Sequence, residues 1–174
     1  LSQFKMFNFL YVWIVTWFSA CMLCIYQPFM KVWVGEENTL SMGIVILFVV
    51  YFYVYKQNDM CGIYKQAAGI WWEGKFMPLV AAGVNLVINI ALVLTIGLSG
   101  ILISTIISLL FVYFPWGTWI LYRNCFNIKG EYIKHMLRQL AYALGACVVC
   151  GITYTICGFI PDTVAGLIAR FMVC

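Results

Sequence analysis

The sequence predicts an all-α protein, a polytopic transmembrane helical bundle of about six spans. Of its 174 residues, 65% are hydrophobic and only 9% are charged, whereas a water-soluble domain has about 25% charged residues. So few polar side chains do not cover a water-exposed surface of this size, and most of the chain is therefore expected to face lipid. This composition excludes an ordinary soluble enzyme, a disordered chain and a small secreted protein.

Runs without a charged residue define the spans. Four such runs contain 25, 18, 47 and 23 residues, and a helix needs about 20 residues to cross about 30 Å of hydrocarbon. The run of 47 is therefore two helices. The runs lack the apolar–polar alternation of outer-membrane strands. The predicted spans are approximately 6–27, 40–56, 77–96, 100–122, 139–159 and 163–174, and together they form one transmembrane region over residues 1–174.

Glycine and proline mark the breaks between these spans. Gly97 and Gly100 divide the longest run, because glycine permits the backbone conformations that a tight hairpin turn requires. Pro28 is expected to follow the first span. Pro115 falls inside the fourth span and is expected to kink it.

The basic residues predict the orientation. If residue 1 is cytoplasmic, Lys31 alone lies in an outer loop, and the inner side receives eight basic residues, which are Lys5, Lys56, Lys65, Lys75, Arg123, Lys129, Lys134 and Arg138. Such an excess of Lys and Arg in short loops is typical of the cytoplasmic side. The net charge of +4 then reflects topology and contact with membrane lipids, and no nucleic-acid partner is expected.

No constellation for catalysis or metal binding is evident. Cys21 and Cys24 are three residues apart, as are Cys147 and Cys150, but no histidine or carboxylate completes a zinc set. We therefore expect these cysteines to pack as small apolar residues. His135 is expected to be a solvated loop residue at the inner interface. These patterns predict no catalytic residue, no metal, no cofactor and no enzymatic activity.

Three polar residues fall inside predicted spans and are candidates for a substrate path. Asn85 and Asn89 are four residues apart and share one helix face, and their amides should point toward other helices or a water-filled cavity. Arg170 lies in the last span, where a charge is costly. Two interpretations stay open for these residues: polar contacts that hold helices together, or groups that line a transport path. Arg170 could also reach an interface with its long side chain.

A series of segments resembles a known transporter family. Residues 70–79 (IWWEGKFMPL) lead into 84–90 (VNLVINI) and then into 97–108 (GLSGILISTIIS), and residues 5–9 (KMFNF) and 28–35 (PFMKVWVG) lie upstream. In this order they resemble the C-terminal part of polysaccharide biosynthesis flippases, the O-antigen (Wzx-like) branch of the multidrug/oligosaccharidyl-lipid/polysaccharide exporter superfamily. Both ends of the chain fall at or within apolar segments, so we expect it to be a C-terminal fragment of a longer protein.

The resemblance implies a two-lobed helical transporter in the bacterial inner membrane. The implied task is the translocation of undecaprenyl-pyrophosphate-linked oligosaccharide units for surface polysaccharide biosynthesis. The implied partners are the lipid-linked oligosaccharide itself and the polymerase and glycosyltransferases that process it. Multidrug exporters share the asparagine and hairpin pattern, so a cation-coupled drug or metabolite antiporter of the same superfamily is the alternative.

Overall fold

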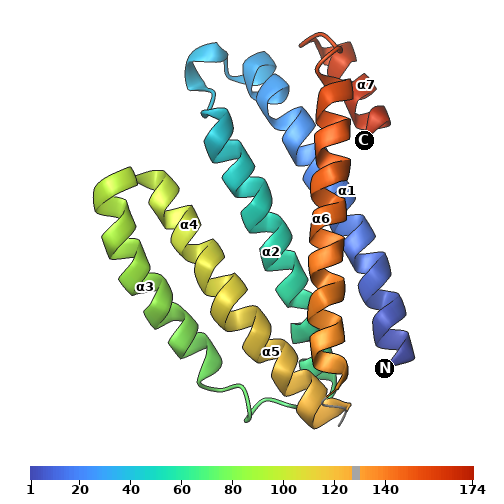
Figure 1. Ribbon diagram of the computed structural model, residues 1–174. Helices are drawn as coiled ribbons and strands as arrows, with labels where there is room; N and C mark the ends of the chain where they lie inside the picture. Colours follow the sequence, from blue (N-terminus) through green and yellow to red (C-terminus); the bar gives the residue numbers. More distant parts are fainter. Residues whose placement is uncertain (127–129) are drawn as a thin grey trace.

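The computed structural model describes residues 1–126 and 130–174, and most of these residues are helical (Figure 1). Successive helical segments run in opposite directions along the long axis of the molecule. They are α1 (Ser2–Trp33), α2 (Met42–Ala67), α3 (Met77–Ile96), a composite fourth segment, α6 (Glu131–Cys157) and α7 (Val164–Val173), with a short 3-10 helix, η1 (Glu36–Asn38), between α1 and α2. No β-strand occurs in the described ranges. The predicted all-α bundle is confirmed.

The fourth segment alternates between α-helix and π-helix. It consists of α4 (Leu98–Ser108), η2 (Leu109–Tyr113), α5 (Phe114–Ile120) and η3 (Leu121–Cys125), and both η elements are π-helical. Pro115 lies directly after the first π-helical stretch. A proline lacks an N–H and its ring crowds the carbonyl four residues before it, and π-bulges relieve such conflicts by widening the helix. The π-helical stretch η2 therefore accompanies Pro115, and the kink expected there stays a prediction.

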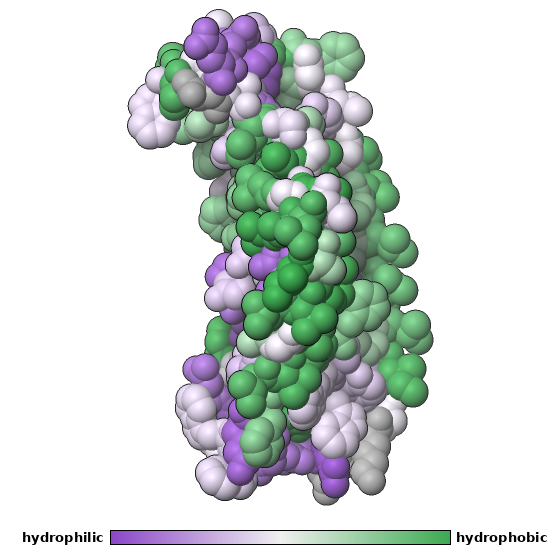
Figure 2. Space-filling model, turned by 90° about the vertical axis from the view of Figure 1, so that its left-hand side faces the viewer, coloured by the Kyte–Doolittle hydropathy of each residue, from purple (hydrophilic) through white to green (hydrophobic). Residues whose placement is uncertain are grey.

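Among the residues that the structure describes, four helical segments are long and apolar enough to cross a membrane. They are α1, α3, α6 and the composite segment Leu98–Cys125. Their outer faces carry exposed apolar side chains, such as Leu94 on α3 and Phe111 in the composite segment, at 84% and 75% exposure. Figure 2 shows an apolar band between more hydrophilic ends. Exposed apolar surface of this extent fits lipid contact. The span 40–56 within α2 and the span 163–174 around the short α7 stay predictions.

Several helices continue beyond the predicted spans. Helix α1 reaches Trp33, so Pro28 lies inside the helix and the prediction that it follows the span was wrong. A proline at this position leaves the Cys24 carbonyl, four residues earlier, without its usual helical donor. Arg170 Nη1 donates a hydrogen bond to that carbonyl at 3.3 Å. The freed backbone group is thereby satisfied, and the helix can continue.

The helices pack side by side in a curved row (Figure 1). Helix α4 packs between α3 and α2, α1 packs between α2 and α6, and α7 packs against α1 and α6. Gly97 joins α3 to α4 with a φ of +60°, a left-handed value that favours glycine. Gly100 permits a close approach, because a Cβ there would lie 2.7 Å from the Leu92 backbone. The predicted glycine hairpin is confirmed.

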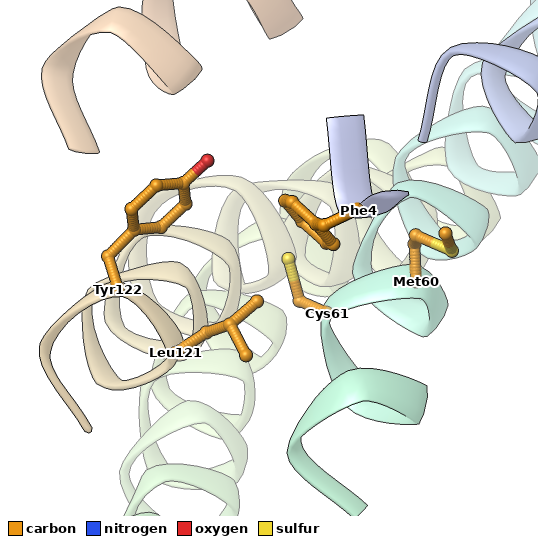
Figure 3. Close-up of a cluster of buried hydrophobic side chains, with 5 residues drawn as sticks. All are labelled: Phe4, Met60, Cys61, Leu121 and Tyr122. Atoms are coloured by element: carbon orange, nitrogen blue, oxygen red, sulfur yellow. The ribbon is translucent and has the colours of Figure 1, made fainter. Parts of the chain in front are cut away.

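A buried apolar cluster joins α1, α2 and η3 at the end of the bundle that holds the N-terminus. It consists of Phe4, Met60, Cys61, Leu121 and Tyr122, all 6% exposed or less (Figure 3). The Phe4 ring meets the Tyr64 ring edge-on, with the centroids 4.8 Å apart. This geometry suits the quadrupoles of the two rings. The cluster holds α1, α2 and η3 together at this end of the bundle.

Candidate functional site: polar groups inside the bundle

The basic residues gather in the half of the bundle that holds the N-terminus. Lys5 on α1 pairs with Glu131 on α6 at 2.7 Å, and Lys134 pairs with the same carboxylate at 3.1 Å. Lys56, Lys65, Lys75, Arg123 and Arg138 belong to helices or loops of this same half, whereas Lys31 lies at the opposite end. Lys129 lies outside the described residues. Some of these basic side chains also make cation–π contacts. The Lys75 amine, for example, is 3.6 Å from the centre of the Trp72 ring.

Lys65 differs from the other basic residues described in this half of the bundle because it is buried. It lies in the last turn of α2, beyond the predicted span 40–56, and is only 9% exposed. Its amine lies 5.8 Å from the centre of the Tyr113 ring and beside Gly117, where a Cβ would be 3.2 Å away. Within the described ranges, no carboxylate lies within ion-pair distance of this amine. Burial lowers the pKa of Lys65.

Two grooves flank the π-helical stretch η2 and meet at Leu109, and their mostly apolar walls include amide and hydroxyl side chains. One groove, of about 470 Å³, runs between α3 and α4 and is lined by Ala81, Ala82, Asn85, Leu86, Thr105, Ser108 and Leu109. The other, of about 450 Å³, runs between α2 and η2 and is lined by Tyr55, Asn58, Asp59, Gly62, Ile63, Gln66, Leu109 and Tyr113. Amide and hydroxyl groups therefore face open space on both sides of η2.

Asn85 and Asn89 lie on α3, and both are partly buried. The Asn85 amide donates a hydrogen bond to Thr105 Oγ1 on α4 at 3.1 Å, and Ser108 Oγ donates to the Ala81 carbonyl at 2.6 Å. Asn89 Oδ1 is buried and accepts no hydrogen bond within the described part of the chain. Asn85 thus both joins two helices and lines the first groove, whereas Asn89 does not line it.

A buried polar cluster that the sequence did not indicate connects α1 to α6. Gln139 Nε2 on α6 donates to Asn8 Oδ1 on α1 at 2.9 Å and lies 3.4 Å from His135 Nε2. All three residues are at most 7% exposed. The expectation that His135 is a solvated loop residue was wrong, because α6 begins at Glu131 and turns His135 inward, where its ring lies 5.3 Å from that of Tyr122. The spacing of His135 and Gln139, four residues apart, is the signal that could have revealed it.

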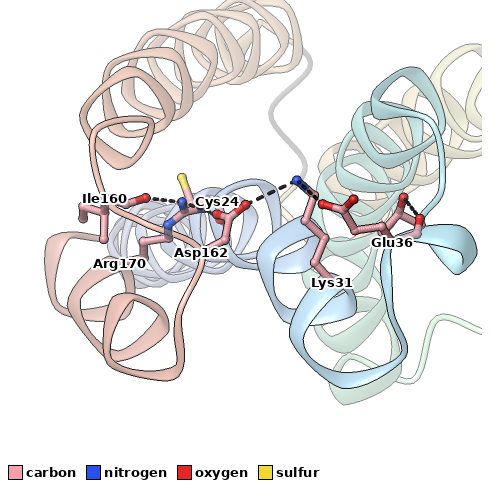
Figure 4. Close-up of polar contacts among 7 residues, drawn as sticks. Cys24, Lys31, Glu36, Ile160, Asp162 and Arg170 are labelled. Carbon is pink, nitrogen blue, oxygen red and sulfur yellow. Dashed lines mark hydrogen bonds and ion pairs between the residues drawn. The ribbon is translucent and has the colours of Figure 1, made fainter.

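Arg170 lies in a polar network at the end of the bundle opposite the N-terminus (Figure 4). Its guanidinium donates to the carbonyls of Cys24 and Ile160 and to Asp162 Oδ1, the last at 2.7 Å. Asp162 also meets the Lys31 amine at 3.3 Å, and Lys31 lies 3.7 Å from Glu36. Arg170 is 8% exposed. Its contacts join α7 to α1, and it lies apart from the residues that line the two grooves.

No protein-family model, curated protein or solved structure matches the chain.

Proposed function

We propose that this chain belongs to a membrane transporter that moves lipid-linked oligosaccharide, carried on undecaprenyl pyrophosphate, across the bacterial inner membrane. The observation that carries the proposal is Lys65, a largely buried cation that has no carboxylate partner among the described residues and that contacts Tyr113, which lines the second groove. A charge in such a position is costly unless it is paired, and ionisable residues that are kept despite this cost commonly have a function. A diphosphate is the anion that would compensate it.

The grooves suit the rest of this substrate. A glycan that leaves water needs replacement hydrogen bonds, and Asn58, Gln66 and Asn85 supply amides along the grooves beside η2. The polyprenyl tail would remain in the hydrocarbon, against the apolar outer faces of the helices. The diphosphate would reach Lys65 from the side of the bundle with most of the basic residues, which would face the cytoplasm. The transporter would then close on this side and open toward the other leaflet.

Transport itself provides the test of this proposal. Cells that lack the full-length gene should accumulate the lipid-linked repeat unit in the inner leaflet and lose surface polysaccharide, and the reintroduced gene should restore both. Unchanged surface polysaccharide would overturn the proposal. Cation-coupled efflux of small amphipathic compounds by the intact protein, without any defect in polysaccharide, would instead favour an antiporter.

Replacing Lys65 with methionine should separate stability from transport. The variant should be at least as stable as the wild type, because it replaces a charged group on a largely buried side chain with an apolar one, but it should lose most of its transport. Since burial lowers the pKa of Lys65, the wild type should gain stability as the pH rises toward the ordinary amine value of 10.5. Lys65→Met should lack this gain. Thermal unfolding at several pH values measures the stability, and the distribution of the lipid-linked repeat unit between the two leaflets measures the transport.

A control for this variant is Lys75→Met, which removes an amine that stacks on the exposed Trp72 ring. It should leave both transport and stability nearly unchanged, because exposed charge contacts contribute about 1 kcal/mol or less. Full transport by Lys65→Met would contradict the assigned role of Lys65.

Asn85→Leu should reduce transport more than it reduces the amount of folded protein. The hydrogen bond to Thr105 is expected to contribute about 0.6 kcal/mol, the average for polar contacts between membrane helices. Asn89→Leu replaces an amide on the same helix that does not line the groove, so it serves as the matched control. If the two variants lost transport to the same extent, Asn85 would act only in packing.

A further inference from the structure

Three thiols from three different helical segments meet near the end of the bundle that carries the Arg170 network. Cys24 lies on α1, Cys157 ends α6 and Cys174 follows α7. Their Sγ atoms all lie within 4.8 Å of one another. Cys24 and Cys157 are each 2% exposed, and Cys174 is partly buried. Sequence spacing could not reveal this group, because its members are far apart along the chain.

The separation of these sulfur atoms suits a shared metal ion. Three sulfur atoms around an ion with metal–sulfur bonds of about 2.3 Å lie about 4 Å apart, so small side-chain rotations would close the group on an ion. A disulfide needs a sulfur separation of about 2 Å and uses only two of the three thiols. We propose that Cys24, Cys157 and Cys174 form a site for a soft monovalent cation, Cu(I).

Ligand type and number favour Cu(I) over zinc. Thiolate sulfur selects soft ions such as Cu(I), whereas structural zinc sites almost always take four ligands. In the described ranges, the group contains neither a histidine nor a carboxylate. A monovalent ion bound by three ligands is therefore the assignment that these residues support.

The negative charge of the thiolate ligands also has to be balanced when the ion binds. Each cysteine that binds as thiolate releases its proton to solvent, and no electron is transferred when Cu(I) binds. The thiolates then outnumber the single positive charge of the ion, which is costly in a buried place. The Arg170 guanidinium donates to the Cys24 carbonyl at 3.3 Å and so places a positive group beside the site, where it also pairs with Asp162. The bound ion would hold α1, α6 and α7 together, whereas the Arg170 contacts join α7 to α1.

Competition with a chelator tests the site. The full-length protein, purified in detergent with reduced thiols and without oxygen, is titrated with Cu(I) against a Cu(I) chelator of known affinity. The wild type should bind one ion per chain. Cys24→Ser, Cys157→Ser and Cys174→Ser should each weaken binding by more than about 10-fold, because losing even an outer partner of a metal ligand commonly has that effect.

Exposed cysteines outside the group provide matched controls. Cys125→Ser and Cys147→Ser should bind Cu(I) as the wild type does. Cys174 is less buried than the other two ligands, so Cys174→Ser keeps the test decisive if a more buried variant fails to fold. Absence of stoichiometric binding, equal binding by Cys174→Ser, or tighter binding of Zn²⁺ than of Cu(I) would overturn the proposal.

Discussion

Gly100→Leu should prevent α3 and α4 from packing and lower the stability of the bundle by about 3 kcal/mol, the upper part of the range for overpacked sites. Even a Cβ at this position would lie 2.7 Å from the carbonyl carbon and oxygen of Leu92. Backbone atoms cannot rotate away as a side chain can. The hairpin would therefore have to open, and the first groove would lose its walls.

Gly83→Leu is the matched control for this prediction. Gly83 lies on α3, and nothing lies within 4 Å of a Cβ built there. The added side chain should be tolerated, with a gain of up to about 1 kcal/mol from helix propensity. Thermal unfolding in detergent, together with the yield of monodisperse protein, measures both variants. Equal behaviour of the two would contradict the close approach at Gly100.

Arg170→Met should lower stability by about 3 kcal/mol, the low end of the range for breaking a buried charge pair. The low end applies because its partner Asp162 has a side chain that is 39% exposed and that water can solvate. The Cys24 and Ile160 carbonyls would also lose their contact with the guanidinium. Lys31→Met should lose less than about 1 kcal/mol, because both groups of the Lys31–Asp162 pair are well exposed.

A double-mutant cycle with Pro28 separates the contributions of Arg170. In Pro28→Ala the new N–H can bond the Cys24 carbonyl, so Arg170 has one acceptor fewer to satisfy. Arg170→Met should therefore be less damaging in the Pro28→Ala background than in the wild type. Equal loss in the two backgrounds would contradict the contact between Arg170 and the proline-freed carbonyl.

The predicted spans agree with the helices in their centres, and the span 77–96 coincides with α3, but α1, α2 and α6 extend well beyond their predicted spans. Charge-free runs identify where a helix can meet hydrocarbon, and all six predicted segments are helical. The runs contain no information on how far a helix continues into water. Helix α2 extends to Ala67 and α6 begins at Glu131, and these extensions carry residues that the sequence assigned to loops, His135 among them.

The candidate site was predictable only where its residues lie close together in the sequence. Asn85 and Asn89 were identified as a shared face, and Asn85 does line a groove. A count of basic residues placed Lys65 at the correct end, but it could not show that the amine is buried, because that depends on the packing of α2 against α5. The Asn8–Gln139 contact joins residues 131 positions apart, and such pairings arise only from the tertiary fold.

Cysteine labelling in intact cells tests the membrane-spanning bundle and its orientation most directly. Glu37→Cys and Ala67→Cys place thiols at exposed positions at opposite ends of the bundle, in a full-length background whose exposed native cysteines are replaced. An impermeant maleimide should label position 37 from outside, and position 67 only after the membrane is permeabilised. Labelling of both positions in intact cells, or the reverse pattern, would contradict the proposed arrangement.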